Sequence, residues 1–403
     1  MPISEHRTVC VVGAGPAGVM TAYMLARKGV STVLLESQQD FDRDFRGDTL
    51  HASSMDILDQ LGIADDVLAL ANAKVEKLSF DFSGRSITLA DFSTLDTHFP
   101  FVAVVPQEKF LSYVVDIAKQ LPQFEVRMGA QVRELKVSGE KINGVRFTWN
   151  GEDRELDADL IIAADGRSST VRELAEISLT KTSPPMDILW FKLPVPANDV
   201  APEGVSGRIG PGNIIAIINR KEYLQVGYII LKGNYRALRE AGIEKLQNDI
   251  ETLMPELADS VSALKDWSQL ATLGVVTGRV SKWYRDGLLL IGDAAHIMSP
   301  VGGVGINYAI QDAVATVNQL FRPLLESSLA TADLAAVQTR REPAVAAIQR
   351  FQAMAQQRVI KGALNSKQIM KPPLPLRLIS SMAFTRKKMA HFIAYGTRHE
   401  RVE

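Results

Sequence analysis

Three glycine-containing segments, far apart in the chain, combine residue types that can hold a phosphate-bearing cofactor. They read Gly13-Ala14-Gly15-Pro16-Ala17-Gly18, then Ala164-Asp165-Gly166, and finally Ile291-Gly292-Asp293. Glycine lets the backbone approach a ligand closely, and a carboxylate beside it can accept hydrogen bonds from sugar hydroxyls. One such segment is a modest signal, but three in this order indicate a single large cofactor that all of them contact.

The first segment has the context of a dinucleotide-binding turn. Residues 8–12 form a β-branched run that predicts a buried strand, and a helical pattern begins at Pro16. A second predicted strand at residues 32–35 ends in Glu36. We therefore expect a strand–helix–strand unit that holds the ADP part of a cofactor.

Each glycine of that turn has its own physical role. Gly13 allows a tight turn, Gly15 lets the backbone approach a pyrophosphate, and Gly18 lets the helix pack closely on the strand. The N-terminus of the helix offers unpaired N–H groups to the phosphates, and Glu36 can accept hydrogen bonds from a ribose diol. This segment alone does not distinguish FAD from NAD.

The second and third segments favour FAD. Strand-like runs lead into Asp165 and Asp293, where a carboxylate at a strand end suits a ribose or ribityl hydroxyl. The glycines after Pro300 suit a backbone pressed against a flat ring. An amphipathic helix predicted from Ile306 would aim its N-terminus at that ring and stabilise negative charge on it.

In this order, the motifs resemble those of the class A flavoprotein monooxygenases, the 4-hydroxybenzoate hydroxylase-like group, over roughly residues 8–322. The resemblance implies an α/β fold: a Rossmann-like FAD-binding domain, an inserted and mainly antiparallel β-sheet substrate domain, and a C-terminal helical segment. It implies FAD as cofactor, with NADPH or NADH and O2 as co-substrates. The expected reaction is hydroxylation of an aromatic or other electron-rich apolar small molecule through a flavin C4a-hydroperoxide.

The resemblance also implies roles for matching positions. Glu36 resembles the acid that binds the adenosine ribose, Arg46 an arginine that contacts FAD, and Gln107 a glutamine near the FAD linker. Asp165 lies in a motif linked to both FAD and NAD(P)H, and Asp293 resembles the ribityl-binding acid. The full predicted cofactor set is Gly13, Gly15, Pro16, Ala17, Gly18, Glu36, Arg46, Gln107, Asp165, Asp293, Pro300, Gly305, Ile306 and Asn307.

The segments between these motifs carry no second dinucleotide signature. Residues 207–212 are glycine-rich but precede a predicted strand rather than a helix, so a nicotinamide cofactor is expected to bind transiently in a surface groove. The expected division is a discontinuous FAD-binding domain (1–76, 102–179 and 271–345), a substrate-binding domain (77–101 and 180–270) and a C-terminal helical segment (346–403).

The substrate domain reads as strands whose alternation suits a sheet with one face over a pocket. Trp190, Phe191, Tyr223 and Tyr228 are candidate pocket walls, although alternate residues of a strand face opposite sides. No catalytic base is assigned. His51 is a candidate for reaching a substrate, with a structural histidine as the alternative reading.

The net charge and the single cysteine limit the functions that the sequence allows. A net charge of −1 gives no general reason to expect nucleic-acid binding, and no metal site is predicted. Because Cys10 is the single cysteine, an intrachain disulfide and a C-x-x-C redox pair are both excluded. Arg208, Arg220 and Lys221 are expected either to meet an anionic substrate or to be solvated.

The chain shows no secretory signal and no apolar run long enough for a membrane span, so the expected compartment is the cytoplasm and the expected state a monomer or homodimer. After a proline cluster at 372–375, residues 376–395 are apolar and basic. They suit a helix that closes over the core, or a helix that makes a weak, peripheral contact with a membrane surface and helps collect a lipophilic substrate.

Three rival functions remain open. A flavin-dependent reductase or dehydrogenase of a lipid-like prenyl substrate would share much of this fold. A flavin-dependent halogenase is expected to carry a W-x-W-x-I-P signature, which the sequence lacks. A carrier that kept the fold and lost catalysis is disfavoured because all three cofactor segments are intact.

Overall fold

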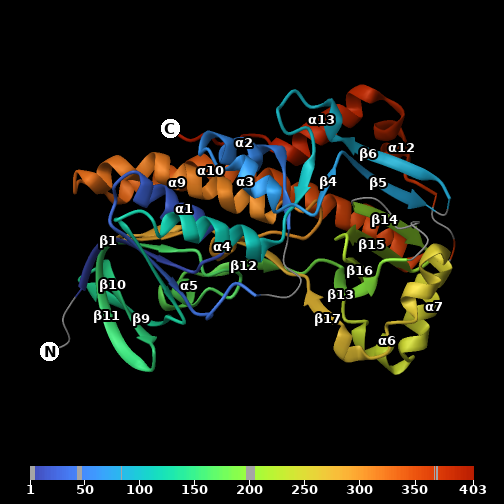
Figure 1. Cartoon of the computed structure of the whole chain (residues 1–403), viewed down its shortest axis with the longest axis horizontal. Helices are drawn as coiled ribbons and strands as arrows, with labels where there is room; N and C mark the ends of the chain where they lie inside the picture. The colour runs from blue at the N-terminus through green and yellow to red at the C-terminus, as the bar shows by residue number, and fades with distance from the viewer. Residues whose placement is uncertain (1–4, 43–47, 83, 197–204, 367, 369–370) are drawn as a thin grey trace.

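The computed structural model describes residues 5–42, 48–82, 84–196, 205–366, 368 and 371–403. Arg46 therefore lies outside the described residues. Two large sheets occupy opposite ends of an elongated molecule, and a layer of long helices runs along one side (Figure 1).

The first large sheet has the order β19-β20-β11-β1-β2-β8, and β10 and β9 extend it from β11. Its central strands β2, β1, β11 and β20 are parallel neighbours. Both faces of these strands are covered, so the side chains of residues 9–12 are buried throughout. The strands are β1 (Glu5–Val12), β2 (Thr32–Glu36), β8 (Phe124–Met128), β9 (Gln131–Ser138), β10 (Lys141–Trp149), β11 (Glu152–Ala163), β19 (Tyr284–Arg285) and β20 (Leu288–Leu290).

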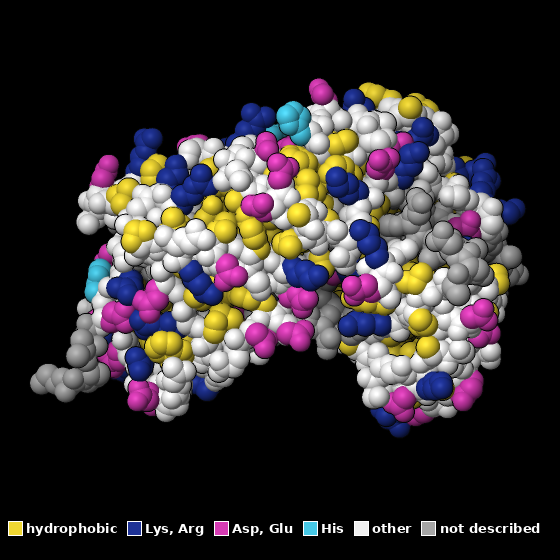
Figure 2. Space-filling view, in the orientation of Figure 1, with side chains coloured by type: hydrophobic (Ala, Val, Ile, Leu, Met, Phe, Trp, Pro, Cys, Tyr) yellow, Lys and Arg dark blue, Asp and Glu magenta, His cyan; other side chains and the backbone are white. Residues whose placement is uncertain are grey.

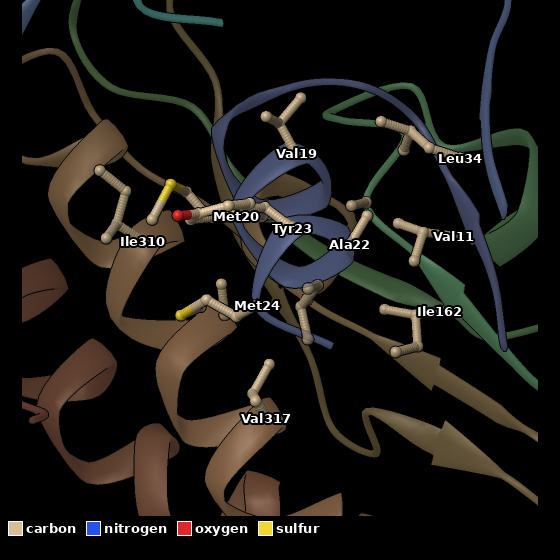
Figure 3. Packing of buried hydrophobic residues seen from close by; sticks show 14 of the residues in the cluster. Val11, Val19, Met20, Ala22, Tyr23, Met24, Leu34, Ile162, Ile310 and Val317 are labelled. Carbon is tan, nitrogen blue, oxygen red and sulfur yellow. The ribbon is translucent and has the colours of Figure 1, made fainter. Parts of the chain in front are cut away.

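One helix of the predicted strand–helix–strand unit is sandwiched between this sheet and a second helix. The two helices are α1 (Pro16–Arg27) and α9 (Gly305–Leu325). Ala22 of α1 lies on the side of the sheet, near Val11, whereas Met20 and Met24 lie on the side of α9, toward Ile310 and Val317 (Figure 3). This packing places the N-termini of both helices at the same end of the sheet as the glycine turns.

The second large sheet has the order β17-β13-β16-β15-β14-β5-β6 and is antiparallel at every step except β14–β5. It therefore confirms the expected, mainly antiparallel sheet. Its strands are β5 (Lys77–Phe82), β6 (Ser86–Asp91), β13 (Met186–Pro194), β14 (Val205–Gly210), β15 (Asn213–Asn219), β16 (Tyr223–Leu231) and β17 (Ala271–Gly274).

The two faces of this sheet bury different side chains. Leu189 and Phe191 of β13 pack with Leu246 and Ile250 of helix α7 (Ile243–Leu253). The intervening Trp190 belongs to the cluster on the opposite face. Period-two alternation along one strand thus assigns neighbouring residues to different environments.

The remaining smaller elements lie between or beside the strands of the two large sheets. They are β3 (Thr49–Leu50), β4 (Ala73–Val75), β7 (Val102–Val104), β12 (Leu179–Thr182), β18 (Thr277–Val280), β21 (His296–Ile297), α2 (Ala52–Gln60), α3 (Ala64–Ala69), α4 (Gln107–Ala118), α5 (Thr170–Leu174), α6 (Tyr235–Glu240), α8 (Ala258–Val261) and the 3₁₀ turn η4 (Gly292–Ala294).

The C-terminal segment is helical, as expected, but residues 376–395 do not form one helix. The elements are α10 (Thr331–Ala355), the π-helical turn η5 (Gln356–Ile360), α11 (Lys361–Asn365), α12 (Leu374–Ser381) and α13 (Ala383–Tyr395). Met382 interrupts the last two with extended backbone angles, φ −118° and ψ 130°. Helix α13 buries Ala390 and Ile393, so it closes over the core, whereas α12 does so only in part. No helix within the described ranges is long and apolar enough to cross a bilayer.

Candidate active site

The turn after β1 touches the second glycine segment directly. A Cβ atom added at Gly13 would lie 2.6 Å from both the carbonyl oxygen of Ala164 and the Cα atom of Asp165. The φ angle of Gly13 is +98°, a conformation that favours glycine. Position 13 therefore needs glycine for two independent reasons, the backbone angle and the close approach.

The same turn also contacts the third segment. A Cβ atom at Gly18 would lie 1.9 Å from the carbonyl oxygen of Gly13, so α1 can approach the strand only without a side chain there. A Cβ atom at Gly292 would lie 3.1 Å from the Cβ atom of Ala17. The structure thus brings all three predicted segments together at the N-terminus of α1.

Gly15 differs from these glycines because the space beside it is open. It is the N-cap of α1, and a Cβ atom there would meet only the carbonyl oxygen of Ala164, at 4.0 Å. No side chain caps the first turn of α1, and Pro16 occupies its first position. An uncapped helix N-terminus beside an open glycine suits a pyrophosphate.

Two of the predicted acids are held by backbone N–H groups. One oxygen of Glu36 accepts a hydrogen bond from the Ala14 N–H (2.7 Å) and the other accepts one from the Gln38 N–H (2.9 Å). Asp165 accepts from the Ser169 hydroxyl (2.5 Å) and the Val171 N–H (3.0 Å). Burial raises the pKa of Asp165, although these hydrogen bonds oppose the rise.

Asp293 lies in η4, directly after β20, and its side chain is half-buried. The loop that follows carries Gly302 and Gly303 with φ angles of +84° and +62°, so its path requires left-handed backbone. Beyond this loop, Gly305 starts α9, whose N-terminus no side chain caps, and Ile306 packs into the core. Pro300 and the glycines are half-exposed, which leaves a backbone surface that a flat ring can approach.

Asn307 fixes this loop against the segment after β3. Its amide nitrogen donates to the carbonyl oxygens of Thr49 (2.9 Å) and Gly303 (3.2 Å). Its amide oxygen accepts from the His51 N–H and the Ser54 hydroxyl, both at 2.7 Å. Because protein groups occupy the whole amide, the side chain acts by shaping the loop.

Two glutamines of the C-terminal segment clamp the other end of the loop. The Gln352 side chain donates to the carbonyl oxygens of Ser299 (2.9 Å) and Val301 (2.8 Å) and accepts from the Ser299 N–H (3.3 Å). Gln356 donates to the Ser299 hydroxyl (2.5 Å). Nothing in the sequence pattern indicates this clamp, which brings the C-terminal segment into the candidate site.

His51 is buried, with 2% of its surface exposed. Its Nδ1 lies 3.0 Å from the carbonyl oxygen of Ile393 in α13, and because a carbonyl only accepts, Nδ1 must carry the proton. Burial lowers the pKa of His51 to about 4, although the bond to Ile393 opposes this shift. Nε2 lies 3.8 Å from where a Cβ atom of Gly303 would stand. The neutral ring therefore links α13 to the loop.

A buried ionic network supports the third segment from behind. Asp312 of α9 accepts from His296 Nε2 (2.5 Å), Arg341 Nε (2.9 Å) and the Gly292 N–H (3.0 Å). Burial raises the pKa of Asp312, but His296 and Arg341 outweigh that effect and hold it below 3.8. His296 is thus placed to support the turn, and Arg341 continues the network to Glu400 (3.3 Å).

Another buried pair joins the second large sheet to the segment before β3. Arg220, after β15, forms an ion pair with Asp48 and donates through Nε to Gln225 (3.0 Å). Asp48 also accepts from the N–H of Gln107 (3.1 Å) at the start of α4. Arg220 is 3% exposed, so it is neither solvated nor open to a substrate as the sequence suggested. Arg208 is also committed to protein, through Glu256 and the Leu253 carbonyl.

The aromatic candidates of the second sheet do not share one environment. Phe191 and Tyr228 lie on the face packed by α7, where the Tyr228 hydroxyl donates to Asp249 (2.8 Å). Tyr223 is half-buried beneath the ammonium group of Lys192, which lies 5.0 Å from its ring centroid. Trp190 packs against the opposite cluster.

That opposite cluster reaches the glycine loop. It contains Ile188 and Ile229 of the sheet, and Trp190, Val301 and Ile360 pack against it. The candidate cofactor loop and one face of the sheet are therefore joined by apolar side chains. Such a boundary excludes water from the space between them.

Comparisons with known proteins agree with this arrangement. Residues 6–352 match the family described as FAD binding domain. The chain is a member of that family of flavoprotein monooxygenases. It is an FAD-dependent oxidoreductase, and residues 6–352 include all three glycine segments.

A curated relative of this flavoprotein matches nearly the whole chain, and others match about three quarters of it. It is 32% identical over 399 residues to 6-methylpretetramide 4-monooxygenase of Streptomyces rimosus, covering 98% of this chain and 94% of that protein. Against two other curated relatives it spans 59% and 61% of their length. It is also 26% identical over 326 residues to digeranylgeranylglycerophospholipid reductase of Methanocaldococcus jannaschii, covering 76% of this chain and 75% of that protein.

A solved structure supports the fold of the flavoprotein. p-Nitrophenol 4-monooxygenase PnpA from Pseudomonas putida DLL-E4 superposes with a TM-score of 0.76 at 19% identity, covering 97% of this chain and 94% of that one. At this identity the likeness concerns architecture.

Proposed function

We propose that the protein hydroxylates an electron-rich aromatic small molecule with NADPH or NADH and O2. In the balanced reaction, one oxygen atom replaces a ring hydrogen as a hydroxyl, and the other leaves as water. The nicotinamide supplies two electrons, and one further proton comes from solvent. The substrate class rests on the monooxygenases among the relatives.

The described residues fit FAD. The open space at Gly15 and the uncapped start of α1 suit the pyrophosphate, while Glu36 suits the adenosine ribose and Asp293 the ribityl chain. The half-exposed loop from Pro300 to Gly305 suits the ring. Bound there, FAD supplies two-electron redox chemistry and the activation of O2.

The observation that carries the proposal is the apolar packing between the loop at residues 300–305 and the second large sheet. Val301 of the loop and Trp190 of β13 pack against one cluster, so a substrate on this face is sheltered from water. Sheltering keeps the activated oxygen from being released unproductively. Residues 77–101 and 180–270 are accordingly proposed as the substrate-binding part, and Trp190 as its first substrate contact.

The test is to supply purified holoenzyme with NADPH or NADH and isotope-labelled O2, together with 6-methylpretetramide or p-nitrophenol. We expect an aromatic substrate to stimulate nicotinamide oxidation and to gain one labelled oxygen atom, detected by mass spectrometry. Nicotinamide oxidation that yields only hydrogen peroxide with every aromatic tested would contradict the proposal.

A second candidate is reduction of a prenyl lipid, which the likeness to the phospholipid reductase favours. This reaction consumes a reductant and no O2. Saturation of a prenyl double bond under anaerobic conditions, with no labelled product in air, would select this function. Cytoplasmic location and a monomeric or homodimeric state stay predictions, which fractionation and sedimentation velocity can check.

A further inference from the structure

The strongest unassigned surface lies at the turn between α12 and α13. Leu374, Leu378, Met382 and Phe384 are all more than half exposed, at 69%, 63%, 51% and 62%. They make up half of the eight large hydrophobic side chains that are exposed in the described ranges, and they fall within eleven consecutive residues. Figure 2 shows hydrophobic side chains gathered at the upper right, where α12 meets α13.

The charge of this part of the chain is one-sided. Residues 343–399 contain ten Lys and Arg residues and no Asp or Glu, although the whole chain has a net charge of −1. Arg377, Lys387 and Lys388 are exposed beside the apolar side chains, and the Lys388 ammonium lies 4.4 Å from the ring centroid of Phe384. Exposed apolar side chains edged by cations are the pattern of a membrane-surface helix.

A polar hollow lies beside this turn. It has a volume of about 240 Å³ and is lined by Lys77, Ser86, Thr88, Asp91, Ser380 and Arg386. Two cations and three hydroxyls face one carboxylate, so the lining favours an anion such as a lipid phosphate. Arg386 also donates to the Ser380 carbonyl oxygen (2.6 Å), which ties α13 to the end of α12.

We propose that residues 374–388, here called the α12–α13 edge, dock on the surface of an anionic lipid bilayer. Its apolar side chains would enter the boundary between headgroups and acyl chains, and its cations would meet lipid phosphates. A second copy of the chain is a poorer occupant, because a twofold interface would place two basic surfaces against each other. The break at Met382 lets α12 lie outward while α13 stays packed on the core.

The edge also leads toward the candidate substrate face. Leu376 of α12 packs against the same apolar cluster as Val301 and Trp190. The opposite side of that helix exposes Leu374 and Leu378. A bilayer-bound edge would therefore sit one helix away from the apolar face on which a lipophilic substrate binds.

The test is flotation of the purified full-length holoenzyme with vesicles of phosphatidylcholine, with or without phosphatidylglycerol. We expect binding only with phosphatidylglycerol, weakened by salt because charges are screened. Leu378→Ser and Phe384→Ser should each weaken partitioning about tenfold. Lys387→Gln combined with Lys388→Gln should weaken it about thirtyfold.

Matched control variants change exposed residues outside the α12–α13 edge. Val137→Ser and Leu325→Ser remove side chains that are 55% and 52% exposed, and Lys119→Gln removes an exposed cation. These variants should float like the wild type, and all variants should keep their flavin content. The proposal is overturned if the wild type does not bind anionic vesicles, or if edge and control variants bind equally. It is also overturned if Phe384→Ser abolishes self-association in sedimentation velocity while vesicle binding is unchanged.

Discussion

The two large sheets both contribute to the candidate active site, but they do so by different means. Around β1 the site is made of backbone, and Gly13 and Gly18 are required because a Cβ atom would collide with neighbouring backbone. On the other sheet the candidate site is made of side chains such as Trp190, which packs against the same apolar cluster as Val301. A backbone site fixes one cofactor, whereas a side-chain face can change its substrate without changing the fold.

The largest effect should come from placing a methyl group in the backbone site. Gly18→Ala puts a Cβ atom 1.9 Å from the Gly13 carbonyl oxygen, so α1 must move away from β1. We expect a loss of at least about 3 kcal/mol in the free energy of unfolding and loss of bound flavin. Urea denaturation and the ratio of flavin to protein absorbance measure the two effects.

Two glycine controls make this comparison sharper. Gly274→Ala in β17 meets no atom within 4 Å, so it should stay within about 0.5 kcal/mol of the wild type and keep its flavin. Gly15→Ala has only a 4.0 Å contact and should fold normally but bind FAD more weakly. Equal flavin binding by Gly15→Ala and the wild type would show that the open space there does not hold the pyrophosphate.

The next largest loss of stability should come from removing a buried carboxylate, and the loss should differ between the two regions. Asp312→Asn leaves Arg341 and His296 without their carboxylate, and removing one partner of a buried pair costs about 3–5 kcal/mol. In the other sheet, Asp187 accepts from Lys232 and from the Gly233 N–H at a more open position. Asp187→Asn should cost only about 1–2 kcal/mol. Urea denaturation at neutral pH compares the two.

The contribution of Asp312 should also appear in how stability depends on pH. Its folded pKa is held below 3.8, so the stability it contributes is present above that value and is lost as the pH falls through the folded pKa. The wild type should therefore destabilise below about pH 4 more steeply than Asp312→Asn. Parallel curves for the two proteins would contradict the role assigned to this carboxylate.

A smaller, pH-dependent effect should come from His51 between the regions. Because its folded pKa is about 4 and the ordinary value is 6.5, the folded state binds its proton less readily than the unfolded chain. Stability from this group is complete above 6.5 and declines as the pH falls toward 4. Between pH 7 and pH 5 the loss should be about 2 kcal/mol.

The matched variant is His51→Asn, whose side-chain amide can still donate to the Ile393 carbonyl oxygen. The variant lacks a titrating ring. Between pH 7 and pH 5, its free energy of unfolding should therefore fall by about 2 kcal/mol less than that of the wild type. If both proteins show the same slope, His51 titrates normally and the ring is not sealed between α13 and the loop.

Sequence alone predicted the elements around Gly13 well because their constraints are local. The strand–helix–strand unit appears at β1, α1 and β2, and the helix predicted from Ile306 is α9, which begins one residue earlier at Gly305. Glycine spacing and hydrophobic periodicity act over a few residues, so one chain is enough to recognise them. The predicted α/β fold class rests on the same local patterns, and the structure confirms it.

The parts that sequence missed depend on distant partners or on packing. Arg220 meets Asp48 across 172 positions, and nothing near Gln352 indicates that it clamps Ser299. The break at Met382 has no proline or glycine beside it to mark it. Along β13 the alternation was predicted, but which face meets the loop depends on how the sheet docks.

The smallest effects should come from neighbouring residues on opposite faces of β13. Phe191→Leu loosens the packing against α7 and should cost about 1 kcal/mol in stability while leaving turnover unchanged. Trp190→Phe should change stability by less than about 0.5 kcal/mol but should raise the fraction of NAD(P)H oxidation that yields hydrogen peroxide. A smaller ring on the loop-facing side leaves the reacting oxygen less well sheltered. Thermal unfolding and peroxide assays on both variants decide the matter, since the reverse pattern would place the substrate on the α7 face.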